Sequence, residues 1–118
     1  MGVEVERLMN LLMRAGLKKN IAKSLAYMVN RDEVTSREIE KEMGLRQPEV
    51  SIAMQWLRKR GWVIKRDVKK EGKGRPVHAY KLAKPFPQIL SEIIREIEAK
   101  IDEDRKVVEE LKKFAQAS

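Results

Sequence analysis

Apolar residues recur every three or four positions through the first sixty residues, and this spacing places them on one face of a helix. A first helix is predicted over residues 4–15, because Gly16 is a favourable stop after its last apolar turn. A second helix is predicted over residues 18–31. Its apolar face consists of Ile21, Ala22, Leu25, Met28 and Val29. The acidic pair at positions 32–33 then breaks the pattern, and Val34 is predicted to be a short extended residue.

Two further helices follow, with a very short connection between them. Thr35 and Glu38 form a capping box, in which the threonine accepts from a free backbone N–H and the glutamate reaches back to the Thr35 N–H. This helix is predicted to end at Gly44. Pro48 suits the first turn of the next helix, because proline has no N–H to leave unpaired there. That helix ends at Gly61, so the sequence predicts two helices joined by a tight turn.

After the fourth helix the hydrophobic period changes. Residues 62–68 are rich in aromatic and β-branched side chains and predict a strand. Residues 69–76 form a glycine- and lysine-rich loop, and residues 77–82 alternate as a second strand. Two strands around one loop predict a β-hairpin. Residues 84–87, Lys-Pro-Phe-Pro, predict a short rigid hinge after it.

The last predicted helix, from residue 86 to about residue 115, carries a heptad seam. Its seam positions follow one another by alternating steps of four and three residues: Leu90, Ile94, Ile97, Ile101, Asp104, Val108, Leu111 and Ala115. A seam sustained over more than three heptads is typical of a coiled coil. Asp104 interrupts it, because a carboxylate buried there without a partner would cost stability.

Charge is distributed unevenly along the 118 residues, whose formal net charge is +8. Residues 62–84 carry eight basic and two acidic side chains, and residues 46–61 carry four and one. Residues 85–118, by contrast, carry six basic and eight acidic side chains. The positive surplus thus lies in the fourth helix and the hairpin, and this favours a polyanionic partner such as nucleic acid.

The composition disfavours several classes of function. The chain has no cysteine and one histidine, His78, so thiolate or histidine metal clusters are not expected. No nucleophile–base pair is visible, and the loop GKGRP lacks the spacing of a phosphate-binding P-loop. No apolar run is long enough for a membrane span, and the first residues lack the features of a signal peptide. We therefore expect a soluble, cytoplasmic protein that is not an enzyme and needs no cofactor or metal.

The predicted order of helix, tight turn, helix and basic hairpin is that of a winged helix-turn-helix. Residues 35–63, TSREIEKEMGLRQPEVSIAMQWLRKRGWV, resemble this motif in winged regulators of the MarR, ArsR and TrmB kinds, and residues 72–82, GKGRPVHAYKL, resemble the wing of archaeal members. The resemblance implies a mainly α fold with a small β-hairpin (α+β). We place the winged helix-turn-helix domain at residues 1–84, including the accessory helix 4–15, and a coiled-coil dimerisation helix at residues 85–118.

The resemblance implies that the fourth helix is a recognition helix, which lies in the major groove of DNA. Val50, Met54 and Leu57 anchor its inner side. The residues expected to face the DNA are Arg46, Gln47, Pro48, Glu49, Ser51, Ile52 and Gln55. By family position the base readers among them are Gln47, Ser51, Ile52 and Gln55. Pro48, Glu49 and Ile52 depart from the family, in which the first two positions are often small and polar and the third is often basic or hydrogen-bonding. A carboxylate repels phosphate unless it accepts from a cytosine amino group, and isoleucine cannot hydrogen-bond; in an alternative interpretation Ile52 packs within the domain.

The wing and the strand before it supply the expected contacts to the DNA backbone and the minor groove. These residues are Lys65, Arg66, Lys69, Lys70, Lys73 and Arg75. Arg75 is the candidate for minor-groove insertion, because narrow grooves attract arginine. Gly72 and Gly74 beside it permit a close approach to DNA. Alternatively, the loop contacts phosphates without reading sequence.

The heptad seam predicts a homodimer, because a helix of about thirty residues, some ~45 Å long, would overhang a small domain. The expected interface residues are Leu90, Ile94, Ile97, Ile101, Val108 and Leu111. A two-fold dimer would place its recognition helices about 34–36 Å apart on a pseudo-palindromic operator.

These expectations combine into a sequence-specific transcriptional regulator of double-stranded DNA, more often a repressor in proteins of this size. Two alternatives are a non-specific architectural DNA-binding protein and a winged protein-interaction module of the transcription machinery. The sequence leaves room for a small-molecule effector, but no set of residues marks its site.

Overall fold

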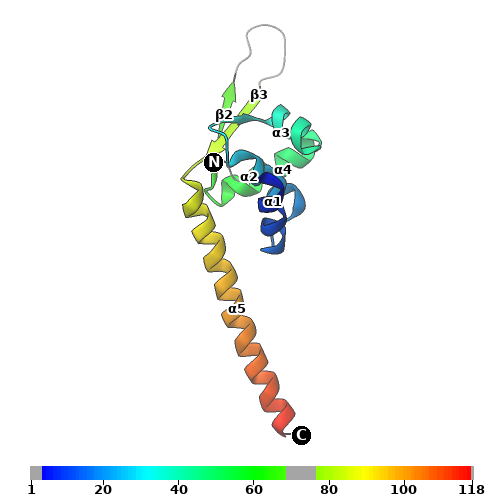
Figure 1. Ribbon diagram of the computed structural model, residues 1–118, viewed down its shortest axis with the longest axis vertical. Coiled ribbons are helices and arrows are strands. Elements are labelled where there is room, and N and C mark those ends of the chain that lie inside the picture. Colours follow the sequence, from blue (N-terminus) through cyan, green and yellow to red (C-terminus); the bar gives the residue numbers. More distant parts are fainter. Residues whose placement is uncertain (1–3, 69–76, 118) are drawn as a thin grey trace. The chain divides into compact units, whose positions relative to one another are not determined.

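The computed structural model describes residues 4–68 and 77–117. Within these ranges five helices and three strands follow in the order α1, α2, β1, α3, α4, β2, β3, α5 (Figure 1). The chain divides into two compact units, Met1–Phe86 and Pro87–Ser118. The mainly helical composition, the small antiparallel sheet and the long last helix confirm the predicted fold class.

The first unit is built around α2 (Lys19–Met28), which packs against α1 (Val5–Arg14) and against both helices of the helix-turn-helix. Seven of its ten residues are buried: Ile21, Ala22, Ser24, Leu25, Ala26, Tyr27 and Met28. The buried side chain of Ser24 donates to the carbonyl oxygen of Asn20 at 2.8 Å, so its hydroxyl donor stays paired on burial. Both predicted helices are confirmed, with slightly shorter ends.

The helix-turn-helix consists of α3 (Ser36–Met43) and α4 (Gln47–Lys59). The Glu38 N–H donates to the Thr35 side chain at 3.1 Å, which confirms the first half of the predicted capping box. The Glu38 carboxylate accepts from the Thr35 hydroxyl at 3.1 Å, whereas the backbone N–H of Thr35 was the predicted donor. Gly44 ends α3 with φ +65°, in the left-handed region that favours glycine. Because glycine adopts this backbone conformation without strain, the chain can turn directly from α3 towards α4.

The sheet has the strand order β1-β3-β2 and is antiparallel throughout. The predicted hairpin is confirmed as β2 (Val63–Val68) and β3 (Val77–Leu82). The extended residue predicted at position 34 lies in β1 (Val34–Thr35), where Val34 pairs with Tyr80 of β3. This third strand attaches the hairpin to the start of α3.

The core of the first unit gathers side chains from all of its helices and from the sheet. The predicted inner side of α4 is confirmed, since Val50, Ala53, Met54 and Leu57 are buried. Trp62 is fully buried before β2, and the ring of the half-buried Trp56 meets it edge-on, with 5.8 Å between centroids. The Arg60 guanidinium lies 4.5 Å from the centre of the Trp56 ring. These contacts fix the C-terminal end of α4 at the start of the hairpin.

The second unit is a single helix, α5 (Phe86–Ala117), whose buried residues are Ile89 and Ile93. Every residue from position 98 to position 117 is exposed, and we call this stretch the distal segment of α5. None of the helices in the described ranges combines the length and apolar character that a membrane span requires. The distal segment nevertheless carries large apolar side chains, including Leu111, which is 62% exposed.

Candidate nucleic-acid interface

The predicted DNA-facing residues gather on the N-terminal half of α4, on the side opposite its buried residues. Glu49 is partly buried, and the other six are exposed: Arg46, Gln47, Pro48, Ser51, Ile52 and Gln55. Ile52 is 67% exposed, which rules out the alternative in which it packs within the domain. Gln47, Ser51 and Gln55 follow one another at steps of four residues, so they form a single polar stripe along the helix. Ile52 lies beside this stripe.

Glu49 differs from its neighbours, because its carboxylate already binds groups of the protein. One oxygen accepts from the Arg46 backbone N–H at 2.8 Å, and the other accepts from the Asn20 side chain at 3.2 Å. The first bond satisfies a backbone donor at the start of α4, as the glutamate of a capping box does. The Arg46 N–H is also the main cause that holds the pKa of Glu49 below its ordinary value. Glu49 is therefore a negatively charged structural group at the tip of the helix.

That α2 holds the turn of the helix-turn-helix was not predicted from the sequence. Asn20 binds Glu49 at the start of α4, and the Lys23 ammonium donates to the carbonyl oxygen of Met43 at the end of α3, at 3.2 Å. Asn20 and Lys23 are three residues apart, so they lie on the same face of α2. Together they fix the end of one helix and the beginning of the next. The only signal in the sequence was this pair of polar residues within a largely apolar helix.

The strand residues that were expected to contact phosphate also have partners within the protein. Arg66 binds Glu33 through two nitrogens, at 2.6 and 3.3 Å, and this bond both lowers the pKa of Glu33 and raises that of Arg66. Lys65 lies 4.0 Å from Asp67, whose carboxylate also contacts the His78 ring at 2.8 Å. Each basic side chain thus has an acidic neighbour with which a phosphate would compete.

Four predicted wing residues, Lys69, Lys70, Lys73 and Arg75, lie outside the described residues, as do the two wing glycines. The strands that flank them are described up to Val68 and from Val77, and these two residues pair with each other. The two strands of the hairpin are therefore paired as far as both ends of the predicted wing.

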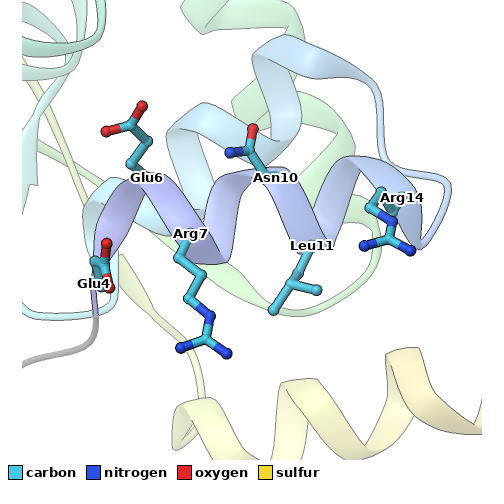
Figure 2. Close-up of a pocket in the computed structure, with 6 residues that line it drawn as sticks. All are labelled: Glu4, Glu6, Arg7, Asn10, Leu11 and Arg14. Carbon is cyan, nitrogen blue, oxygen red and sulfur yellow. The ribbon is translucent and has the colours of Figure 1, made fainter.

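Among the surface hollows of the described residues are two on the helices of the first unit. Figure 2 shows the one on the outer face of α1, lined by Glu4, Glu6, Arg7, Asn10, Leu11 and Arg14. The other lies between the start of α2 and the exposed side of α4, and its lining includes Ile21, Glu49 and Ile52. The first is formed by side chains of one helix with mixed charge, and the second is mostly apolar and borders the polar stripe of α4. In the described part of the chain no group of three or more acidic or histidine side chains could hold a metal ion.

The chain matches the model of a known protein family. The model of a family described as "Sugar-specific transcriptional regulator TrmB" matches residues 11–86, which include the whole helix-turn-helix and the hairpin. No protein of curated function matches the chain at a significant level.

Several solved structures share the fold of this chain at low sequence identity. TrmBL2, described as an archaeal chromatin protein with a novel mode of DNA binding, has a TM-score of 0.64 at 18% identity; the match covers 93% of this chain but only 39% of that one. A possible transcriptional regulator from Methanosarcina mazei Go1 has a TM-score of 0.60 at 16% identity, and the match covers 88% of each chain. NadR, solved in complex with 4-hydroxyphenylacetate, has a TM-score of 0.54 at 16% identity. The match covers 88% of this chain and 72% of NadR.

Proposed function

The chain belongs to the TrmB family of transcriptional regulators, and from this premise we propose that it is a sequence-specific regulator that inserts α4 into the major groove of double-stranded DNA. The observation that carries the proposal is the exposed polar stripe of Gln47, Ser51 and Gln55. These side chains stand on a helix whose opposite side is buried in the core. An α-helix fits the major groove, where each base pair presents a distinct pattern of donors and acceptors.

The chemistry of the stripe suits base recognition. A glutamine side chain can bind adenine through two hydrogen bonds, and a serine hydroxyl can donate or accept. Ile52 adds an exposed apolar side chain that fits against the methyl group of thymine. We therefore expect an operator rich in A·T pairs, at the positions that α4 reads.

Glu49 has a different role in this proposal from that of its neighbours on α4. Its carboxylate binds the Arg46 N–H and the Asn20 side chain, so we assign it to orientation of the helix and not to contact with DNA. Arg46, which is exposed at the same helix end, is the expected partner of a phosphate.

The hairpin is proposed to bind the DNA backbone beside the major groove. Lys65 and the wing residues Lys69, Lys70 and Lys73 are assigned to phosphates, and Arg75 to the minor groove. Arg66 is expected to contribute less, because a phosphate must compete with the carboxylate of Glu33. Contacts of this kind hold the protein in register on the duplex without reading sequence.

We also propose that the protein is a homodimer joined through α5, and that it acts as a repressor. The heptad seam of this helix places exposed apolar side chains along one side: Ile94, Ile101, Val108 and Leu111. A second copy would cover them, because two-fold pairing is the commonest assembly of soluble proteins. A dimer at an operator would block other proteins from the same DNA.

A second candidate function is binding of DNA without sequence preference. It is favoured by the exposed Ile52, which cannot hydrogen-bond to a base, and by the description of TrmBL2 as a chromatin protein. The two functions differ in salt dependence, since a protein that binds only phosphates loses affinity steeply with salt and equally on all sequences.

Selection from randomised duplex DNA at ~0.15 M salt tests the proposal. We expect an enriched motif with two related half-sites, since a two-fold dimer presents two copies of α4. Binding without any enriched motif would support the non-specific candidate, and absence of binding would contradict both.

A further inference from the structure

Helix α5 carries both the apolar seam and a set of charges that can orient a partner helix. The seam positions are flanked on one side by Glu98, Arg105 and Lys112 and on the other by Ile93, Lys100 and Val107. Residues next to a heptad seam form the contacts that decide which partner is bound and in which direction. These flanking residues are all exposed except Ile93.

We propose that two copies of α5 pair antiparallel, about a two-fold axis that passes between Asp102 and Glu103. This inference rests on the proposed homodimer and adds its direction and register. In this register Leu90 lies opposite the partner's Ala115, Ile94 opposite the partner's Leu111 and Ile97 opposite the partner's Val108. In the two central layers Ile101 lies opposite the partner's Asp104, and Asp104 lies opposite the partner's Ile101.

The carboxylate in the seam is the first argument for this direction. In a parallel dimer with aligned chains each residue meets its own copy, so Asp104 would face the partner's Asp104 in one layer. Two carboxylates at a desolvated interface repel each other and cannot both stay ionised at low cost. In the antiparallel pair Asp104 faces Ile101 of the partner subunit, and Lys100 of the partner subunit is one residue further along. The acidic side chain then has a cation beside it.

The charges beside the seam favour the same direction. In the antiparallel pair Glu98 lies next to the partner's Arg105. The two side chains are offset along the helix axis by only two residues, or about 3 Å. Symmetry makes a second identical pair on the other side of the centre. In the parallel dimer Arg105 would instead lie beside the partner's Lys100, and no pair of opposite charges would form between these positions.

The same residues also select the register. Sliding the antiparallel partner by one heptad keeps apolar layers together but changes the flanking charges. In one direction Glu98 meets the partner's Glu98 and Lys100 meets the partner's Lys100. In the other direction Arg105 meets the partner's Arg105. The register centred between positions 102 and 103 thus avoids a like-charge contact that each neighbouring register creates.

Cysteine cross-linking tests the direction, because the natural chain contains no cysteine. The variants are Ile94→Cys and Leu111→Cys, treated with a short thiol-specific cross-linker either alone or as a mixture allowed to exchange subunits. In the antiparallel dimer positions 94 and 111 of different chains are adjacent, while two copies of position 94 lie about 26 Å apart along the axis. We expect cross-linked dimer only in the mixture, with one chain of each variant. The control, Ala99→Cys, places its thiol on the outer side of the helix and should not cross-link.

Each result of this experiment decides the direction. Efficient cross-linking of either variant alone would show parallel helices and overturn the proposal. Absence of any cross-link in variants that sediment as dimers would also overturn it, since another surface would then join the chains. A wild-type protein that sediments as a monomer would refute the homodimer itself, whereas selection from randomised DNA tests the DNA-binding proposal separately.

A charge reversal tests the register by an independent measurement. Arg105→Glu turns two attractive contacts with Glu98 into repulsive ones, so we expect the dimer to dissociate about tenfold more readily at low salt. Adding Glu98→Arg should restore the dimer. In a parallel dimer Arg105→Glu would instead relieve the contact with Lys100 and tighten the dimer, which would overturn the proposal. Arg95→Glu, the same substitution on the outer side of α5, is the matched control.

Discussion

The helix-turn-helix and the distal segment of α5 differ in where their side chains find partners. Around α4 the groups that fix the backbone are bound within one chain, as Glu49 binds Arg46 and Asn20. The distal segment has the same mixture of apolar and charged residues, but every one of its residues is exposed. The first region is complete in a single chain, whereas the second has the side chains of an interface. This difference is the basis of the proposed homodimer.

The largest expected effects come from replacing one leucine by alanine in each of the two regions. Leu57→Ala empties a site that is fully buried, so we expect it to lower the free energy of unfolding by about 2–5 kcal/mol. Leu111→Ala removes a side chain that is 62% exposed in one chain. It should leave the unfolding of the monomer nearly unchanged and weaken the dimer. Chemical denaturation at two protein concentrations, together with sedimentation, measures both effects.

Similar effects of Leu57→Ala and Leu111→Ala on unfolding would contradict the proposed difference between the two regions. A concentration-independent loss of several kcal/mol in Leu111→Ala would mean that position 111 is part of a single-chain core.

Gly44→Ala should have the next largest effect on stability. The residue has φ +65°, and a side chain there is strained although no atom lies within 4 Å of the place where its Cβ would be. We expect a loss of about 1 kcal/mol in the free energy of unfolding. Gly44→Asn is the control, since asparagine tolerates this backbone region better, and it should lose less. Equal losses in both variants would point away from backbone strain as the cause.

Glu33→Gln should strengthen DNA binding by a few-fold at low salt. The substitution removes the carboxylate that binds Arg66 and leaves the guanidinium available to a phosphate. The slope of log affinity against log salt should steepen by up to about 2, because each of the two subunits gains up to one phosphate contact and each contact contributes about 1. Titration of a fixed duplex at several salt concentrations measures it. Asp32→Asn removes an adjacent exposed charge and is the matched control; an equal gain there would indicate a general effect of net charge.

The smallest expected effect is a change in the pH dependence of stability on replacing Glu49. Its pKa is held below the ordinary value in the folded protein, mainly by the Arg46 N–H, so the unfolded chain binds its proton first as pH falls. The stabilisation is therefore complete above the ordinary glutamate pKa, about 4.3, and is lost as pH decreases through the lowered folded value. Glu49→Gln should be less stable than wild type at neutral pH, with the difference shrinking in acid. Denaturation at neutral and acidic pH measures this, and a pH-independent difference would contradict the assigned role.

The sequence was sufficient for the parts of the fold that depend on local signals. Helix periodicity, the cap at Thr35 and the stop at Gly44 act over a few residues, and the structure has them where they were predicted. The contacts that orient α4 and the hairpin join residues far apart in the chain: Asn20 and Glu49 are separated by 29 positions, and Glu33 and Arg66 by 33. No local pattern marks such pairs, because each side chain alone resembles an ordinary exposed polar residue.

The candidate site shows the same limit. Exposure of Gln47, Ser51 and Gln55 could be predicted, because the buried period of α4 leaves only the opposite side for them. The role of Glu49 could not, because its second partner comes from another helix. A charge that looked unfavourable for DNA binding is thus explained by what it binds inside the protein.

The proposal that the outer stripe of α4 reads bases can be tested by measuring the specificity ratio of the Gln55→Ala variant. The ratio compares affinity for the selected operator with affinity for a scrambled duplex at the same salt concentration. We predict that Gln55→Ala lowers this ratio by at least about 10-fold with unchanged affinity for the scrambled duplex, since each bidentate base contact contributes about 1–3 kcal/mol and the dimer loses two of them. Gln88→Ala, the same change at an exposed position of α5, should leave the ratio at the wild-type value. A ratio unaffected by Gln55→Ala, or an equal loss on both duplexes, would contradict the claim.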